Sequence, residues 1–185
     1  MGIPLHLPTI DREGTVPPPA HRGICWLQDK PVAASLTDTL AIYAAAKAAN
    51  VPVFSASSLR WAEGCQAARK GDFGAVLGVD AFSPCALEET QPSLFWYGIH
   101  GCEMLFTAMG PGCATVSRTQ TEDTDVCVGT WGDGRVGTFR GMRNKAAYGG
   151  YAYGEDEIGE LGGSPGCAPR SPARAGLHLL RWVLH

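Results

Sequence analysis

The hydrophobic and polar positions of the first third of the chain predict a strand–helix–strand unit. Ser35 precedes a helical pattern and Asp38 occupies the third position after it, an arrangement similar to a capping box. Asn50 suits a left-handed residue just beyond the helix. Apolar runs at 24–27 and 51–55 predict the flanking strands, which would pair in a parallel sheet. The positions that recur at helical spacing are Leu40, Ala41, Tyr43, Ala44 and Ala48.

Beyond this unit the pattern becomes mainly that of strands. Helices are predicted over 57–70 and 98–109, with a loop over 84–93 between them. The Gly-Asp-Gly sequence at 132–134 is typical of a hairpin turn. Strands are predicted over 75–82, 114–118, 124–131, 135–143 and 145–153. The chain therefore reads as a βα unit followed by an α+β sheet domain, with strands mainly antiparallel.

Composition and charge restrict the class of protein. The 185 residues include 24 glycines and 13 prolines, which favours many turns and few long helices. The net charge of −3 argues against a nucleic-acid-binding surface, which would be basic. The sequence has no apolar run of about 20 residues and no secretory signal pattern at its start. We therefore expect a cytoplasmic protein that binds neither nucleic acid nor a membrane.

The seven cysteines predict core thiols rather than a metal or redox motif. Their number is odd and no Cys-x-x-Cys sequence occurs, which argues against a zinc ribbon or a thioredoxin-type site. Scattered thiols are typical of a reducing compartment. A metal site built from His100, Cys102 and Cys113 would have no recognised ligand spacing, so we expect no metal.

Three stretches within 23–163 together resemble the Gfo/Idh/MocA oxidoreductases, the relatives of glucose–fructose oxidoreductase and inositol dehydrogenase. The sequence Asp-Lys-Pro-Val-Ala at 29–33, with the helix and strand that follow it, resembles the end of the family's nucleotide-binding half. Residues 94–109 resemble its histidine-bearing helix. The sequence Glu-Asp-Thr-Asp at 122–125 and the 132–134 hairpin resemble its open sheet domain.

The resemblance implies a fold and a domain organisation. The fold is α+β: a remnant βα unit of a Rossmann domain, then an open, mainly antiparallel β-sheet domain with one or two helices. The predicted segments are an irregular Pro-rich arm over 1–22, the remnant of the nucleotide-binding domain over 23–56, the sheet domain over 57–163 and an irregular tail over 164–185.

The resemblance also implies two catalytic residues. Lys30 takes the place of the family's lysine near the nicotinamide, and with Pro31 it would contact the cofactor. His100 takes the place of the histidine that transfers a proton. Asp29 stands where the family has glutamate, and Trp96 stands where many members have aspartate. From spacing alone, the favoured interpretation of Lys30 is a solvated loop lysine, and that of His100 is a surface or satisfied histidine.

A helical projection of 98–109 supports a role for His100. His100, Glu103 and Thr107 share the polar side, so the imidazole is expected to face a cleft, where it could exchange a proton with an alcohol. Glu103 would orient the imidazole or contact substrate, or it is an exposed carboxylate. The apolar side comprises Ile99, Cys102, Leu105, Phe106 and Met109.

Aromatic and basic residues complete the candidate set. Trp96 and Tyr97, after Phe95, would wall a sugar or polyol pocket, and core packing is an equal alternative. Arginines on the predicted strands could bind an acidic group of a substrate, although a solvated sheet face is favoured. These arginines are Arg118, Arg140 and Arg143.

The first residues lack the family's cofactor motif. The first glycines are Gly2, Gly14 and Gly23, too far apart for G-x-G-x-x-G. The cofactor of the resembled family is NAD or NADP, and we expect this chain alone not to bind it. The chain therefore reads as a truncated oxidoreductase acting on a sugar-like or polyol substrate. The alternative is a catalytically inactive sheet domain for oligomerisation or sugar binding. An open sheet predicts a homo-oligomer.

Overall fold

The computed structural model describes residues 26–28, 30–144 and 147–162. It contains two compact units, residues 1–56 (unit 1) and residues 57–185 (unit 2). The predicted arm over 1–22 and tail over 164–185 lie outside the described residues. Among the described residues, no helix has both the length and the apolar character needed to cross a membrane.

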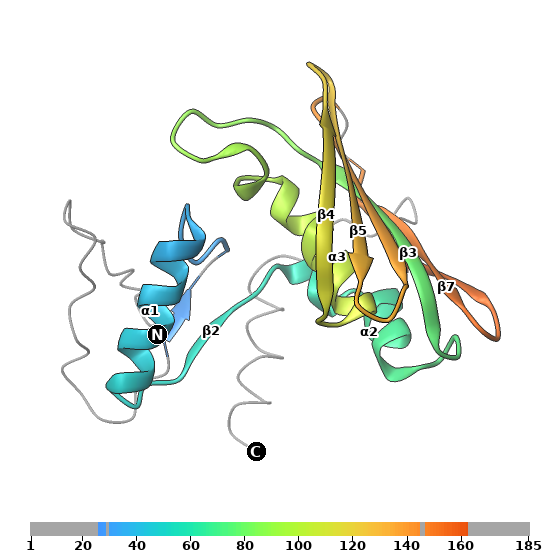
Figure 1. Ribbon diagram of the computed structural model, residues 1–185, viewed down its shortest axis with the longest axis horizontal. Helices are drawn as coiled ribbons and strands as arrows, with labels where there is room; N and C mark the ends of the chain where they lie inside the picture. The colour runs from blue at the N-terminus through green and yellow to red at the C-terminus, as the bar shows by residue number, and fades with distance from the viewer. Residues whose placement is uncertain (1–25, 29, 145–146, 163–185) are drawn as a thin grey trace, which may run out of the picture. The chain divides into compact units, whose positions relative to one another are not determined.

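Unit 1 contains the predicted strand–helix–strand element (Figure 1). It consists of β1 (Trp26–Gln28), α1 (Leu36–Ala48) and β2 (Val53–Ser55), and the two strands pair in parallel. Ser35 caps α1, because its Oγ accepts a hydrogen bond from the backbone N–H of Asp38 at 3.0 Å. Asn50 has a φ of 54°, so the predicted left-handed residue is confirmed.

Unit 2 is built on a mixed sheet of six strands in the described residues, with order β4-β5-β6-β3-β7-β8 (Figure 1). The parallel pair is β3 with β6, and the other pairs are antiparallel. The predicted fold class, an open and mainly antiparallel sheet with few helices, is thereby confirmed. The strands are β3 (Val76–Pro84), β4 (Cys113–Gln120), β5 (Thr124–Trp131), β6 (Val136–Met142), β7 (Gly149–Gly154) and β8 (Ile158–Gly162).

The prediction of one continuous helix over 57–70 is wrong, because the segment forms two separate elements. It forms a 3₁₀ turn, η1 (Ser58–Trp61), and a separate helix, α2 (Glu63–Lys70). Ala62 separates them because its ψ of 139° is not helical. Ser57 caps η1, with its Oγ accepting from the N–H of Leu59 at 3.2 Å. This break matters because it fixes the position of Ser57.

Helix α3 (Gly98–Met109) has the predicted bounds, but its buried face overlaps the predicted apolar side only in part, at Leu105 and Met109. Phe106, predicted to be buried, is 45% exposed. The buried face instead includes Gly101, where an added Cβ would lie only 2.4 Å from Cε2 of Phe139. A small residue therefore lets α3 approach the sheet closely, which a projection based on large apolar side chains does not anticipate. The polar side of α3 is left away from the sheet.

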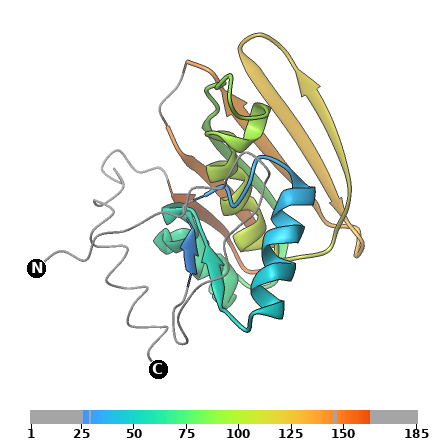
Figure 2. The same cartoon turned by 90° about the vertical axis from the view of Figure 1, so that its left-hand side faces the viewer.

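The sheet of unit 2 has two unlike faces (Figure 2). Helices α2 and α3 pack on one face, over a core that includes Val79, Met104, Phe139 and Leu161. No helix of the described part of unit 2 covers the other face. Strand alternation places these residues there: Asp80, Phe82, Val126, Val128, Val136, Thr138, Tyr151, Tyr153 and Ile158.

Candidate functional site

His100 lies in the first turn of α3 and is held by Ser57. The Oγ of Ser57 lies 2.6 Å from Nδ1 of His100. Ser57 is only 1% exposed, so its position is fixed by the surrounding protein. The same Oγ accepts the N–H of Leu59, which leaves the hydroxyl either to donate to the imidazole or to accept from it.

Glu103 fixes the segment that presents Ser57. Its Oε2 accepts the backbone N–H of Ser57 at 2.7 Å, and its Oε1 accepts Nε of Arg60 at 2.5 Å. The carboxylate is mostly buried, with 12% of the side chain exposed. Glu103 therefore acts on His100 through Ser57, and both of its oxygens are occupied by donors of the protein. Contact between Glu103 and a substrate stays a prediction.

Aromatic rings surround His100. Its ring centroid lies 5.8 Å from that of Tyr97 and 5.7 Å from that of Tyr148, which meets it edge-on at 84°. Trp96 extends this group, with its centroid 5.8 Å from Tyr97. Tyr148, which the sequence analysis did not identify, is half-buried, and burial followed by the neighbouring Tyr97 raises the pKa of its phenol. The ring of Tyr148 therefore belongs to the surroundings of the imidazole.

The Ser57–His100 pair suits proton exchange better than nucleophilic catalysis. A nucleophilic serine must reach the substrate, and a side chain 1% exposed does not. The hydroxyl can instead serve either imidazole tautomer, because it accepts from a protonated Nδ1 and donates to an unprotonated one. With Nδ1 held in this way, Nε2 is the nitrogen that could exchange a proton with a ligand.

Lys30 and Pro31 belong to unit 1, at the turn between β1 and α1, and the peptide bond between them is cis. Lys30 is half-buried. His100 and its partners belong to unit 2. The approach of Lys30 and His100 to a shared cleft, about 10 Å or less apart, therefore stays a prediction.

The predicted arginines divide into two kinds. Arg140 is exposed, in keeping with a solvated sheet face. Arg118 and Arg143 instead bind Asp125, which is 0% exposed: Nε of Arg118 donates to Oδ1 at 2.7 Å, and Nη2 of Arg143 donates to Oδ2 at 2.5 Å. The solvated reading is wrong for Arg143, whose side chain is only 10% exposed. A buried carboxylate needs such partners to remain charged.

The described cysteines are free thiols, as the sequence predicted. Cys65 and Cys85 are fully buried. Burial raises the pKa of Cys65 to about 12. The pKa of Cys102 is also raised to about 12, mainly by burial and to a smaller extent by the neighbouring Cys127, Cys85 and Asp125. Thiols with such pKa values are poor nucleophiles near neutral pH. Among the described residues, no group of three His, Cys, Asp or Glu side chains could hold a metal ion.

The described part of unit 1 does not fit the pyrophosphate of NAD or NADP. That group is held by free N–H groups at a glycine-rich turn and a helix N-terminus. At α1 the N–H of Asp38 is already bonded to Ser35, and the Asp38 carboxylate in the first turn would repel phosphate. Between Gly23 and Gly64 the sequence contains no glycine. These residues therefore lack the usual elements of a dinucleotide site.

Comparison with solved structures places the fold among oxidoreductases of the Gfo/Idh/MocA type. Myo-inositol 2-dehydrogenase from Lactobacillus plantarum matches with a TM-score of 0.65 and 15% identity, over 77% of this chain and 52% of its own. UDP-N-acetylglucosamine 3-dehydrogenase from Acidithiobacillus ferrooxidans matches with a TM-score of 0.60 and 17% identity, over 74% of this chain and 49% of its own. GenD2 of gentamicin A biosynthesis, solved with NAD, matches with a TM-score of 0.61 and 17% identity, over 72% of this chain and 46% of its own.

These likenesses confirm the expected fold. The chain spans about half the length of the structures it matches. No protein-family model matches the sequence, and no curated protein does either. The α+β sheet fold that the resemblance implied is therefore a fold that this chain shares with these structures.

Proposed function

We propose that this chain carries the substrate-binding and proton-transfer part of a Gfo/Idh/MocA-like oxidoreductase that acts on a sugar-like or polyol substrate. His100 takes the proton of a substrate hydroxyl through Nε2, or returns it in the reverse direction. NAD or NADP, when bound, would supply the hydride acceptor. The remainder of the proposal concerns only residues of this chain.

One observation carries the proposal: the 2.6 Å contact between Ser57 Oγ and His100 Nδ1. A general base must keep one ring nitrogen oriented while the other exchanges a proton. Glu103 secures that contact by bonding the backbone of Ser57. Tyr97 and Tyr148 add aromatic rings next to the imidazole, and Trp96 adds a further ring beside Tyr97, which suits a ligand rich in C–H groups.

Lys30 is proposed to act from the cofactor side, together with Pro31. An ammonium group there would bind a substrate hydroxyl and favour loss of its proton. The alternative is an inactive sheet domain: for oligomerisation it would have no use for the Ser57–His100 pair, and for sugar binding it would use His100 only as a hydrogen-bonding group.

The chain is expected to bind myo-inositol with a dissociation constant of about 1 mM or tighter, measured by calorimetric titration. His100→Gln should weaken binding by roughly 3- to 10-fold, the value of one neutral hydrogen bond. Trp96→Ala should weaken it by a similar factor through lost ring contact. The control is Thr107→Ala, because Thr107 lies about two turns after His100 on the same side of α3. This variant should bind inositol as tightly as the wild-type chain does.

Equal binding of cyclohexanol, which has the ring but a single hydroxyl, would contradict recognition of a polyol. Equal binding by wild type and His100→Gln would contradict the role of the imidazole. An absence of binding by the wild-type chain would exclude a preformed substrate site in unit 2.

We further propose that the helix-free face of the sheet pairs with a second copy of the chain. Exposed apolar side chains on this face include Val136, Tyr151 and Ile158. Val136→Lys should convert an oligomer to a monomer in light scattering, because it places a charge among the exposed apolar side chains of this face. Val116→Lys is the matched control, since Val116 is exposed on the opposite side. A monomeric wild-type chain at high concentration would refute the proposal.

A further inference from the structure

The loop that carries Trp96 and Tyr97 has its two ends close together. This site loop, residues 85–97, joins β3 to α3. Its first residue, Cys85, is fully buried, and an added Cβ on Gly98 would lie 3.0 Å from the Cys85 sulfur. Leu94 lies against Gly98 as well, at 3.2 Å from the same position. The two ends of the site loop therefore meet at the start of α3.

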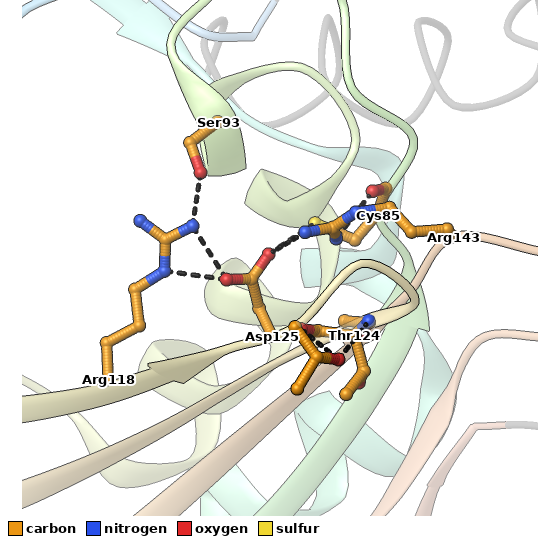
Figure 3. A network of polar contacts seen from close by, with 8 residues as sticks. Cys85, Ser93, Arg118, Thr124, Asp125 and Arg143 are labelled. Carbon is orange, nitrogen blue, oxygen red and sulfur yellow. Dashed lines mark hydrogen bonds and ion pairs between the residues drawn. The ribbon is translucent and has the colours of Figure 1, made fainter.

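The first end of the site loop is tied to Asp125 through Arg143. Nη1 of Arg143 donates to the carbonyl oxygen of Cys85 at 2.9 Å, while its Nη2 donates to Asp125 (Figure 3). The backbone N–H of Cys85 is also bonded, to the carbonyl of Met142 at 2.9 Å. One buried guanidinium thus connects the loop to the carboxylate.

The second end is tied to the same carboxylate through Arg118. Nη2 of Arg118 donates to Oγ of Ser93 (Figure 3). The same Nη2 lies 2.6 Å from Oδ1 of Asp125, and Nε of Arg118 also donates to this Oδ1. Ser93 has a φ of 37°, an uncommon value for a residue other than glycine. It lies three residues before Trp96 and four before Tyr97, so this bond holds the part of the loop next to the aromatic rings.

We infer that Asp125 is a positioning residue for the candidate site: through Arg118 and Arg143 it holds both ends of the site loop and thereby places Trp96 and Tyr97 beside His100. The inference rests on the proposed function for its effect on a ligand, but its structural part stands independently. Trp96 is 37% exposed and meets the ring of Tyr97 edge-on, with centroids 5.8 Å apart. Asp125 itself touches neither the rings nor the imidazole, so its effect passes through the arginines.

Arg118→Met tests the inference without removing the buried carboxylate. It releases Ser93 and leaves the pair of Arg143 and Asp125 intact. Arg135→Met is the matched control, because Arg135 also donates Nε to an aspartate, Asp133, at 2.7 Å, but on the β5–β6 hairpin. Arg118→Lys tests rescue, since an ammonium can bond to only part of what the guanidinium holds.

Three quantities are measured on the full chain: hydrogen exchange of amides 86–97, the ring-proton NMR shifts of His100 and the affinity for myo-inositol. In Arg118→Met, exchange should rise at least about 10-fold, as expected for local opening. The His100 signals should move as Tyr97 shifts, and inositol affinity should fall about fivefold. Ser93→Ala should change each of the three quantities in the same direction as Arg118→Met, but by less. Arg118→Lys should lie between Arg118→Met and wild type in each quantity, and Arg135→Met should match wild type.

Loop exchange and His100 signals in Arg118→Met that equal those of Arg135→Met would overturn the inference. Changes in both, together with wild-type protein that does not bind inositol, would uphold the placement of the loop by Asp125 and refute the proposed function instead. A loss of inositol affinity with unchanged loop exchange would also overturn the inference, because the arginine would then act on the ligand and not on the loop.

Discussion

Asp125→Asn is expected to lower the free energy of unfolding by about 3–5 kcal/mol, the usual effect of breaking a buried ion pair by removing one partner. Asp125 is fully buried and accepts from both Arg118 and Arg143. The amide removes the charge that compensates two guanidiniums and turns an N–H₂ group toward donors. Chemical denaturation of the two proteins measures the difference.

Asp133→Asn provides the control for that experiment. Asp133 also bonds to an arginine, Arg135, but its side chain is 54% exposed, so water replaces the lost contact. Its unfolding curve should coincide with that of wild type. A similar loss in both variants would mean that the buried pair contributes no more than a surface pair does.

NAD and NADP are expected to bind to the chain alone at least about 100-fold more weakly than to an intact low-micromolar site. Backbone N–H groups at a glycine-rich turn supply much of the affinity for a dinucleotide. In the described residues the start of α1 is occupied by its own Ser35 cap and carries Asp38. Lys30 could contact a nicotinamide, but one contact does not offset the entropy lost when so large a ligand is ordered.

Calorimetric titration with each cofactor measures this prediction. Asp38→Asn is an informative companion variant, because it removes the carboxylate from the first turn of α1 without removing the Ser35 cap. It should not create binding, since the glycine turn is still missing. A low-micromolar dissociation constant for wild type would contradict the expectation and would indicate a phosphate site elsewhere in the chain.

Local signals explain which parts of the fold are predictable from the sequence. The Ser35 cap, the bounds of the 98–109 helix and the 132–134 hairpin are encoded by neighbouring residues, and each lies where it was predicted. The β8 strand was missed because it is a five-residue segment with two glycines and acquires its structure by pairing with β7. The break at Ala62 was also missed, since alanine gives no local sign of a helix boundary.

The candidate site shows the same division between local and long-range information. His100 could be identified from its place on the polar side of a helix and from the family resemblance. Ser57 lies 43 positions away in the sequence and Tyr148 lies 48 away, so only the fold brings them to the imidazole. A serine that follows a strand and precedes a turn was the available signal for Ser57, and it reads equally as a simple helix cap.

Asp125 illustrates a further limit of sequence reasoning. Its neighbours 122–124 are polar, so nothing local marks the second residue of the predicted strand over 124–131 as buried. Its burial depends on alternation along β5, on the position of Arg143 after β6 and on the loop that follows β3. A buried charge becomes recognisable only when its partners from other strands are known.

The central claim is that His100, held by Ser57 at Nδ1, exchanges a proton with a polyol hydroxyl through Nε2. The most direct test is ¹⁵N NMR of the two ring nitrogens during titration with myo-inositol, with His100→Gln used for assignment. We predict that inositol shifts the Nε2 signal and leaves Nδ1 nearly unchanged, whereas Ser57→Ala shifts Nδ1 without any ligand. Ring nitrogens that do not respond to inositol, or an Nδ1 signal that is the same in Ser57→Ala and wild type, would contradict it.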